Sequence, residues 1–208
     1  MDLNRLEDVA RYLGNPAQAY GAERMVCAEG KNKGCTVYDV RTGGGLQYQI
    51  LADNAMDIGS LYYKGVNLHY LTKNGHQADP DTSDFFYSFP GGMLYTCGLM
   101  SAGDGNTDGG ILHPIHGRIH SVPSERSGAE ITEGNIVITG KMRESRYSGY
   151  CLELEREVRS PLGLSLIHIS RRQRTDEFSR RPDAGELVFC DLCFCKKIAV
   201  PCSGVDIE

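Results

Sequence analysis

Alternation of apolar and polar residues is the clearest regular pattern in the chain, and it predicts β-strands. Residues 35–42 are rich in β-branched and aromatic side chains, and residues 43–53 follow them after a glycine turn. In the second segment Leu46, Tyr48 and Ile50 fall on one face, because successive side chains of a strand point to opposite sides. These two segments therefore predict a pair of neighbouring strands.

Further strands are predicted downstream. Residues 56–72 indicate two short strands broken at Lys64–Gly65, which extends the first pair into a β-meander. The apolar run 91–100 predicts a buried strand, and residues 135–144 and 150–160 predict antiparallel strands with one wet face. In these last two segments the residues that we predict to face inward are Ile136, Ile138, Leu152, Leu154 and Arg156.

Two other segments have a different character. Residues 3–13 predict a short helix, ended by Asn15 and Pro16. Residues 74–91 are typical of a loop, yet they contain the aromatic cluster Phe85, Phe86, Tyr87 and Phe89. Such a cluster either plugs one end of a sandwich or lines a pocket. Together the short strands and glycine turns of residues 34–160 predict a mainly β sandwich.

Composition limits the class of protein. A length of 208 residues fits one domain, or one domain and a tail. The net charge of −5 argues against nucleic acid as a partner, and the chain has no run of about 18 apolar residues that would predict a membrane span. The N-terminus contains acidic residues and has no apolar signal region. We therefore expect a cytoplasmic protein with reduced thiols.

The stretch HPIHGRIH, residues 113–120, holds three of the six histidines of the chain. A metal-dependent enzyme could use His113, His116 and His120, but Pro114 and Gly117 oppose the helix that would align them. Acid/base chemistry is an alternative, because a histidine titrates near neutrality. A structural role, in which His116 packs at a strand end, is the third reading.

Four stretches carry a resemblance to a known family: VRTGGGLQYQIL, MDIGSLYYKGVNL, FPGGMLYTCGLMSAG and LHPIHGRI. In this order they make residues 15–163 resemble the aldose 1-epimerase-like family, within the branch catalogued as a domain of unknown function. The resemblance implies a partial galactose-mutarotase-like β-supersandwich of antiparallel sheets. It also implies binding of a monosaccharide or sugar derivative, and aldose 1-epimerase-like isomerase activity in the intact protein without a cofactor or metal. A non-catalytic carbohydrate-binding module is the alternative function.

The resemblance also implies roles for single residues. His116 is similar to the first active-site histidine of the family, which contacts the sugar near its ring oxygen. Arg118 then contacts sugar hydroxyls, Asp57 lies in a motif near the pocket, and His113 and Asn54 complete the predicted substrate-binding set. Asn54 stands where relatives often carry a basic residue.

The implied mechanism is ring opening by acid/base catalysis. One group takes the proton of the anomeric hydroxyl, another protonates the ring oxygen, and reclosure on either face exchanges the anomers. The family places its base, a glutamate, and a second histidine later in the chain, and no segment here matches them. We therefore expect this chain to be an inactive fragment.

The sequence changes character near residue 163. The heptapeptide LSLIHIS, residues 164–170, matches the in-frame translation of a transposon-end sequencing adapter. We therefore expect residues 1–163 to be the N-terminal part of the β-sandwich domain and residues 164–208 to be a non-native or disordered tail. The thiols of this tail, Cys190, Cys193, Cys195 and Cys202, are spaced unlike a common zinc framework.

Overall fold

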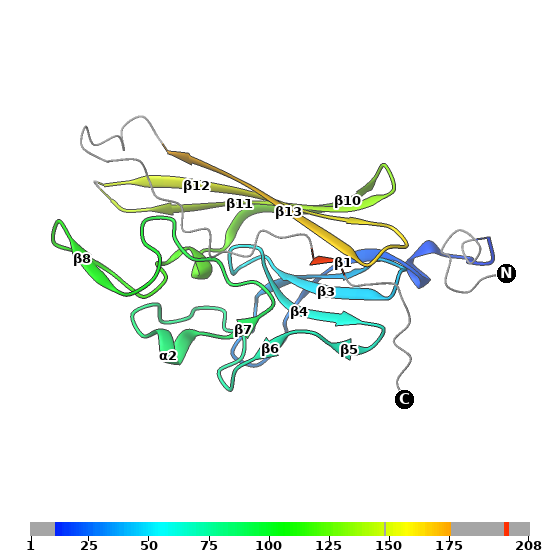
Figure 1. The fold of residues 1–208 in the computed structure, drawn as a ribbon, viewed down its shortest axis with the longest axis horizontal. Coiled ribbons are helices and arrows are strands. Elements are labelled where there is room, and N and C mark those ends of the chain that lie inside the picture. Colours follow the sequence, from blue (N-terminus) through cyan, green and yellow to red (C-terminus); the bar gives the residue numbers. More distant parts are fainter. Residues whose placement is uncertain (1–10, 148, 176–197, 200–208) are drawn as a thin grey trace.

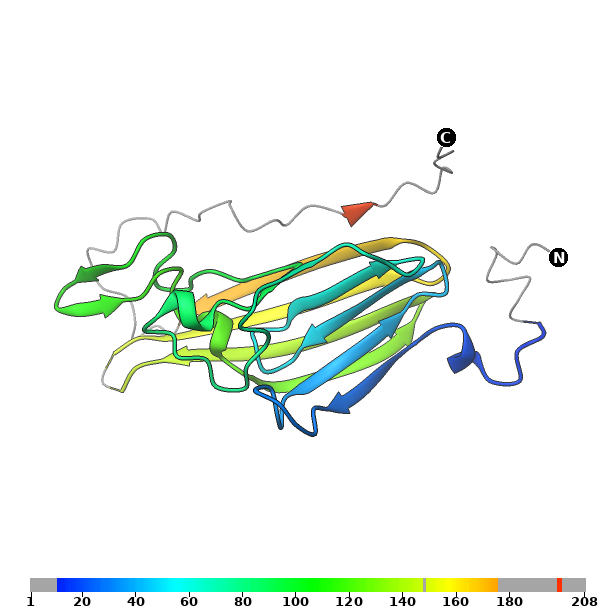
Figure 2. The ribbon, with the colours of Figure 1, turned by 90° about the horizontal axis from the view of Figure 1, so that it is seen from below.

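Two antiparallel β-sheets packed face to face form the body of the molecule (Figures 1 and 2). The computed structural model describes residues 11–147, 149–175 and 198–199. The strands of the first sheet, in spatial order, are β1 (Gly21–Val26), β2 (Thr36–Arg41), β3 (Leu46–Leu51), β4 (Asp57–Tyr63) and β5 (Val66–Asn67). Those of the second are β10 (Ser124–Thr132), β11 (Asn135–Ser145), β12 (Cys151–Pro161), β13 (Leu166–Thr175) and β14 (Ile198–Ala199).

The remaining elements are short and lie between the two sheets in sequence, apart from η1 at the start. They comprise η1 (Pro16–Gln18), β6 (Tyr70–Leu71), α2 (Phe85–Ser88), β7 (Gly91–Gly92), β8 (Asn106–Asp108), β9 (Ile111–His113) and η2 (Ile119–Ser121). In Figure 1, α2 and β8 project together beyond one end of the first sheet. The elements from β6 to η2 and the loops that join them, residues 70–121, form the loop cluster. It carries most of the residues that the sequence singles out.

The hydrophobic core lies between the sheets, and it confirms the predicted strand faces. Leu46, Tyr48 and Ile50 are all buried on β3, while Ile136 and Ile138 meet them from β11. On β12 burial alternates along the whole strand. The inward face of β12 contains Leu152, Leu154, Arg156, Val158 and Ser160. A sheet with one buried face requires this period of two, which explains why alternation located the strands.

The structure differs from the predicted elements in several places. Residues 91–100 form only the two-residue strand β7 and then an irregular loop, in which Gly98 adopts a positive φ angle that is foreign to a regular strand. The predicted helix 3–13 falls largely outside the described residues.

Several strands were not predicted, and β10 and β13 are the longest of them. β10 was missed because it is a mostly exposed strand with no apolar alternation. The strand pattern also continues beyond residue 163, since β13 pairs with β12 from Leu152↔Thr175 to Arg159↔His168. The adapter origin of residues 164–208 stays a prediction, which resequencing of the encoding DNA tests.

Near the loop cluster, the Met56 side chain packs against Gly140 of the second sheet, in a contact that we call the socket between Met56 and Gly140. Ala55 and Met56 form a tight turn with positive φ angles before β4, and both side chains are fully buried. The Met56 side chain fills the space above Gly140 of β11, where an added Cβ would lie 2.6 Å from Met56 Cγ. The turn that precedes β4 therefore packs against the opposite sheet at the place where Gly140 has no side chain.

Candidate functional site

His116 lies in the turn between β9 and η2, and its backbone conformation is unusual. Its φ angle is 62°, in the left-handed region that non-glycine residues rarely adopt. Two backbone hydrogen bonds hold it there: Gly98 N donates to His116 O at 3.0 Å, and His116 N donates to Gly103 O at 2.8 Å. The surrounding loops thus fix the position of the imidazole. His116 therefore lies in a turn and not in an extended strand.

Gly117 explains how the chain passes through this site. A Cβ added there would lie 2.3 Å from Gly98 O and 2.5 Å from Ser101 O, and its φ angle is 78°. Only glycine fits such a close backbone contact at a positive φ angle. The glycine in HPIHGRIH therefore packs His116 tightly against the loop that begins at Gly98.

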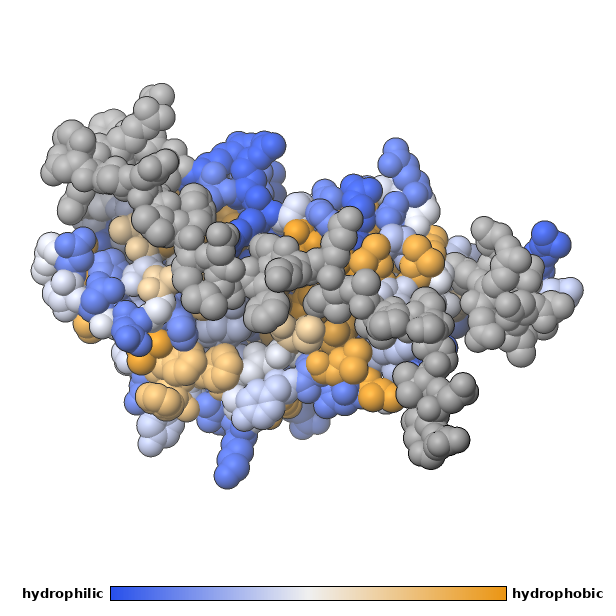
Figure 3. Space-filling view, in the orientation of Figure 1, coloured by the Kyte–Doolittle hydropathy of each residue, from blue (hydrophilic) through white to orange (hydrophobic). Residues whose placement is uncertain are grey.

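The aromatic cluster of the loop lies beside His116. The Phe85 ring meets the His116 ring edge-on at 5.2 Å, and Phe85 stacks on Phe89 at 4.8 Å between centroids. The centroid of the Tyr95 ring lies 6.5 Å from that of His116 and 5.0 Å from that of Phe89. Phe86, at 80% exposure, extends this cluster to the surface, where Figure 3 shows apolar side chains around α2. The cluster thus borders the His116 site and does not fill the space between the sheets.

Arg118, His113 and Glu144 form a second group near the same turn. The Arg118 guanidinium donates to Leu112 O at 3.0 Å, and His113 is buried at the end of β9. Glu144 is buried at the end of β11 and accepts from Leu99 N at 3.2 Å and Tyr150 Oη at 3.0 Å. Burial raises the pKa of Glu144, while these donors and the charges of Arg118 and His113 oppose the rise. Glu144 therefore fastens the loop at Leu99 to the second sheet.

Asp57 lies away from solvent in a hydrogen-bonded network that joins the two sheets and leaves Arg156 Nε unpaired among the described residues. Arg156 Nη1, from β12, donates to Asp57 Oδ1 at 2.8 Å and to Ala55 O at 2.7 Å. Thr96 N donates to Asp57 Oδ2 at 2.8 Å, and Arg156 Nη2 donates to Thr96 Oγ1 at 2.7 Å. Burial raises the pKa of Asp57, and the Arg156 and Thr96 contacts oppose that rise. The predicted contact of Asp57 with a sugar stays a prediction; in this structure its hydrogen-bond partners are protein groups.

His120 and Tyr95 line a small cavity beside this network. The His120 side chain is 5% exposed, and its ring stacks on Tyr95 at 4.7 Å. Among the described residues, neither ring nitrogen of His120 has a hydrogen-bond partner, nor has the buried hydroxyl of Tyr95. Burial, followed by the nearby His116, lowers the pKa of His120 to about 4, so the ring is neutral near pH 7. The other residues that line this cavity include Asn54, Asp57, Gln77, Ser88 and Leu94.

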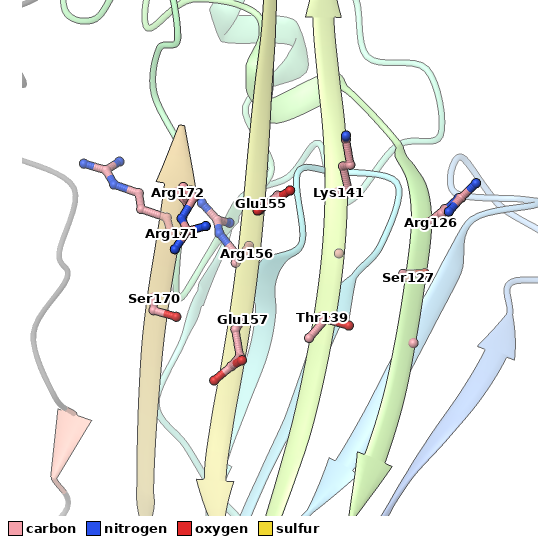
Figure 4. Close-up of a pocket in the computed structure, with 12 residues that line it drawn as sticks. Arg126, Ser127, Thr139, Lys141, Glu155, Arg156, Glu157, Ser170, Arg171 and Arg172 are labelled. Carbon is pink, nitrogen blue, oxygen red and sulfur yellow. The ribbon is translucent and has the colours of Figure 1, made fainter. Parts of the chain in front are cut away.

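A larger groove of about 710 Å³ lies on the outer face of the second sheet. Figure 4 shows Arg126, Lys141, Glu155 and Arg172 on the four successive strands β10 to β13, and the strand register places them in one row. Partly exposed ion pairs cover this face, such as Lys141 with Glu153 at 2.8 Å. None of the predicted site residues lines the groove. The structure instead brings those residues together around the loop cluster.

Other predicted features can be placed briefly. Among the described residues, no group of three or more His, Cys, Asp or Glu side chains is arranged to hold a metal, and this includes His113, His116 and His120. The four cysteines between Cys190 and Cys202 lie outside those residues. Within the same part of the chain, no helix has the length and apolar character to cross a membrane.

The fold matches part of the galactose-mutarotase-like architecture. The chain is similar to the crystal structure of a candidate aldose 1-epimerase from Klebsiella pneumoniae subsp. pneumoniae MGH 78578, with 18% identity and a TM-score of 0.64. The match covers 73% of this chain and 42% of that one. A galactose 1-epimerase from Lactobacillus acidophilus NCFM shares 13% identity at a TM-score of 0.49, with 76% of this chain and 49% of that one covered. The chain therefore spans less than half the length of these structures.

The sequence model of the DUF4432 family, described as a domain of unknown function, matches residues 32–182. The chain belongs to this family, which confirms the predicted resemblance. The match also runs past residue 163, where the native sequence was predicted to end. No curated protein matches the chain.

Proposed function

We propose that the intact protein binds a monosaccharide or sugar derivative at the loop cluster around His116. One observation carries the proposal: a half-buried imidazole is held in a fixed turn beside a partly exposed aromatic cluster. The C–H face of a pyranose can pack on rings such as Phe85, while its hydroxyls hydrogen-bond to polar groups. Sites of this kind combine an apolar wall with a few oriented polar groups. The similarity to the Klebsiella structure supports this proposal through the fold.

Within this proposal His116 contacts the sugar near the ring oxygen. A histidine can donate a proton to that oxygen as the C–O bond breaks, and accept it again as the ring closes. Arg118 lies two residues further on, and its fork of donors suits neighbouring hydroxyls. The reaction proposed for the intact protein is the exchange of anomers of an aldose, as in aldose 1-epimerases.

Binding is tested first, because it does not require a complete catalytic site. D-glucose, D-galactose, D-mannose and L-rhamnose are titrated into the protein and followed by calorimetry and NMR. We expect at least one to bind, and His116→Ala to weaken that binding about tenfold or more, which corresponds to the loss of roughly one good hydrogen bond. His168→Ala, at an exposed imidazole of β13, is the matched control and should bind normally. Equal affinity in all three proteins would refute the site.

Catalysis is tested separately by polarimetry. We expect the 208-residue chain not to accelerate anomer exchange, since ring opening needs a base and the family places its glutamate in a later segment. Catalysed exchange by this chain would contradict that expectation. If a protein of the full family length binds sugar and shows no exchange, the alternative of a non-catalytic carbohydrate-binding module holds.

A further inference from the structure

The cavity beside His120 contains polar groups that the fold leaves without partners. Both nitrogens of the His120 ring and the Tyr95 hydroxyl are buried and make no hydrogen bond within the part of the chain that the structure describes. Leaving a buried polar atom unpaired costs about 1–3 kcal/mol, so three such atoms in contacting rings form an expensive arrangement. Proteins normally satisfy such groups with a ligand or an ordered water.

The size of the cavity limits what can enter it. Its free volume is about 10 Å³, which fits roughly one water-sized group and no sugar ring. The guest is therefore a single small group, either a water molecule or one substituent that reaches in from a larger ligand. The centroids of the His116 and Tyr95 rings lie 6.5 Å apart, so the proposed sugar site is next to this cavity.

The chemistry of the lining selects the kind of group. A neutral imidazole offers one N–H donor and one acceptor nitrogen, and a tyrosine hydroxyl can donate or accept. The two amides of the lining are already donors elsewhere: Asn54 Nδ2 to His120 O at 3.4 Å, and Gln77 Nε2 to Tyr87 O at 3.0 Å. The nearby Asp57 carboxylate disfavours an anion, and its pairing with Arg156 removes its attraction for a cation. A neutral group that both donates and accepts fits these partners.

We infer that the His120–Tyr95 cavity is a binding site for one O–H group. In the free protein the O–H group is that of a water molecule. In the complex it is one hydroxyl of the bound sugar, which makes this cavity the part of the proposed site that selects for the presence of that hydroxyl. The second statement rests on the proposed function, whereas the first does not.

Melting experiments without sugar test the O–H site itself. Tyr95→Phe removes one oxygen atom and nothing else. If the cavity holds an O–H group, the melting temperature should fall by about 2–4 °C, because a hydrogen bond worth roughly 1 kcal/mol is lost. If the cavity is empty, Tyr95→Phe should raise the melting temperature, since an unsatisfied hydroxyl is removed, and the inference is overturned.

The control for this experiment is Tyr147→Phe, at a side chain that is 98% exposed, and it should not change the melting temperature. His120→Gln is the second variant, because it keeps one donor and one acceptor. It should melt closer to the wild type than His120→Leu does. The reverse order would indicate an apolar, empty cavity.

Deoxy sugars distinguish the two sources of the O–H group. The tightest-binding aldose of the four titrated above is compared with its monodeoxy analogues on the wild type and on Tyr95→Phe. For one position, loss of the hydroxyl should weaken binding about tenfold on the wild type and hardly at all on the variant. Equal losses on both proteins for every position would overturn the sugar hydroxyl as guest and leave water. Absence of binding by any aldose would refute the proposed function alone, because the melting result stands without it.

Discussion

Two buried polar clusters lie side by side in this protein, and they differ in how their hydrogen bonds are satisfied. The closed cluster is that of Asp57, Thr96 and Arg156, in which five hydrogen bonds of 2.5–2.8 Å satisfy every side-chain polar atom except Arg156 Nε. The cluster of His120 and Tyr95 is open, because three of its buried atoms find no partner in residues 11–147, 149–175 and 198–199. Both contribute to the lining of the same small cavity.

The difference indicates that the first cluster stabilises the fold, whereas the second has polar groups available to bind a ligand. A network in which all polar atoms but one are paired is largely self-sufficient, and this one joins β12 of one sheet to the start of β4 in the other. An open group of buried donors and acceptors is costly unless something binds there. The closed cluster therefore keeps the loop around Thr96 in place, and the open cluster presents its free groups to a guest.

The largest expected effect comes from breaking the closed cluster. Arg156→Met leaves the Asp57 carboxylate buried without its partner, so we expect the free energy of unfolding to drop by about 3–5 kcal/mol. Arg159→Met is the control on the same strand, at an ion pair with Glu157 that is partly exposed, and should cost about 1 kcal/mol or less. Urea denaturation measures both. A loss in Arg156→Met no larger than that of the control would show that the ion pair is not essential to the fold.

The next effect is a pH dependence of the open cluster. Burial lowers the pKa of His120 from 6.5 to about 4, so between these values the unfolded chain binds a proton that the folded chain does not. Stability is therefore complete above pH 6.5 and falls by up to about 3 kcal/mol as the pH drops to 4. His120→Gln should remove this part of the slope when unfolding is followed from neutral to acidic pH. Parallel wild-type and variant curves would contradict the assignment.

A smaller effect on stability, with a larger one on binding, is expected at His116. Asparagine tolerates the left-handed conformation better than most residues, so His116→Asn should change the free energy of unfolding by less than about 1 kcal/mol. Sugar binding should still be lost, because asparagine cannot place an imidazole beside Phe85. Melting curves and calorimetric titration of the same sample compare the two. Unchanged sugar affinity would remove His116 from the site.

The smallest effect is expected on the outer face of the second sheet. Lys141 pairs with Glu153 at 2.8 Å, but Arg143 also reaches Glu153 at 3.1 Å. Lys141→Ala should therefore cost no more than about 0.5 kcal/mol, because Arg143 still pairs with Glu153 and ion pairs open to solvent on one side are weak. It should also leave sugar binding unchanged, since the groove of Figure 4 contains none of the proposed contacts. A marked loss of sugar affinity would move the site from the loop cluster to this face.

The sequence predicts those parts of the fold in which one face of a strand is buried. The strands that contain Tyr48, Ile138 and Leu154 follow from alternation, because a sandwich core selects every second residue. β10 has no such signal, since it lies at the edge of its sheet with mostly exposed side chains. The turn at His116 is likewise not predicted, because Pro114 and Gly117 exclude a helix without specifying which turn replaces it.

The candidate site is predictable in part for a similar reason. His116 and Asn54 are identified from local motifs, and Arg156 was expected to face inward from the phase of β12. Its partner Asp57 lies 99 residues earlier, and no local pattern links the two. The open cavity arises where Tyr95, in a loop, stacks on His120 of η2 in the folded chain, a contact that alternation does not describe. Buried polar contacts can be predicted where a charged residue stands at a strand position at which the alternation calls for an apolar one. Arg156 and Glu144 are two such residues.

The socket between Met56 and Gly140 has a consequence for how related sequences can diverge. Any side chain at residue 140 would occupy the volume of the Met56 thioether, as the 2.6 Å approach to Cγ shows. Relatives that carry alanine or serine at this place in β11 should therefore have a smaller residue at the place of Met56, so the two positions should covary. Met56 immediately precedes Asp57, which lines the small cavity. A substitution at Gly140 in the second sheet should therefore alter the shape of that cavity beside the first sheet.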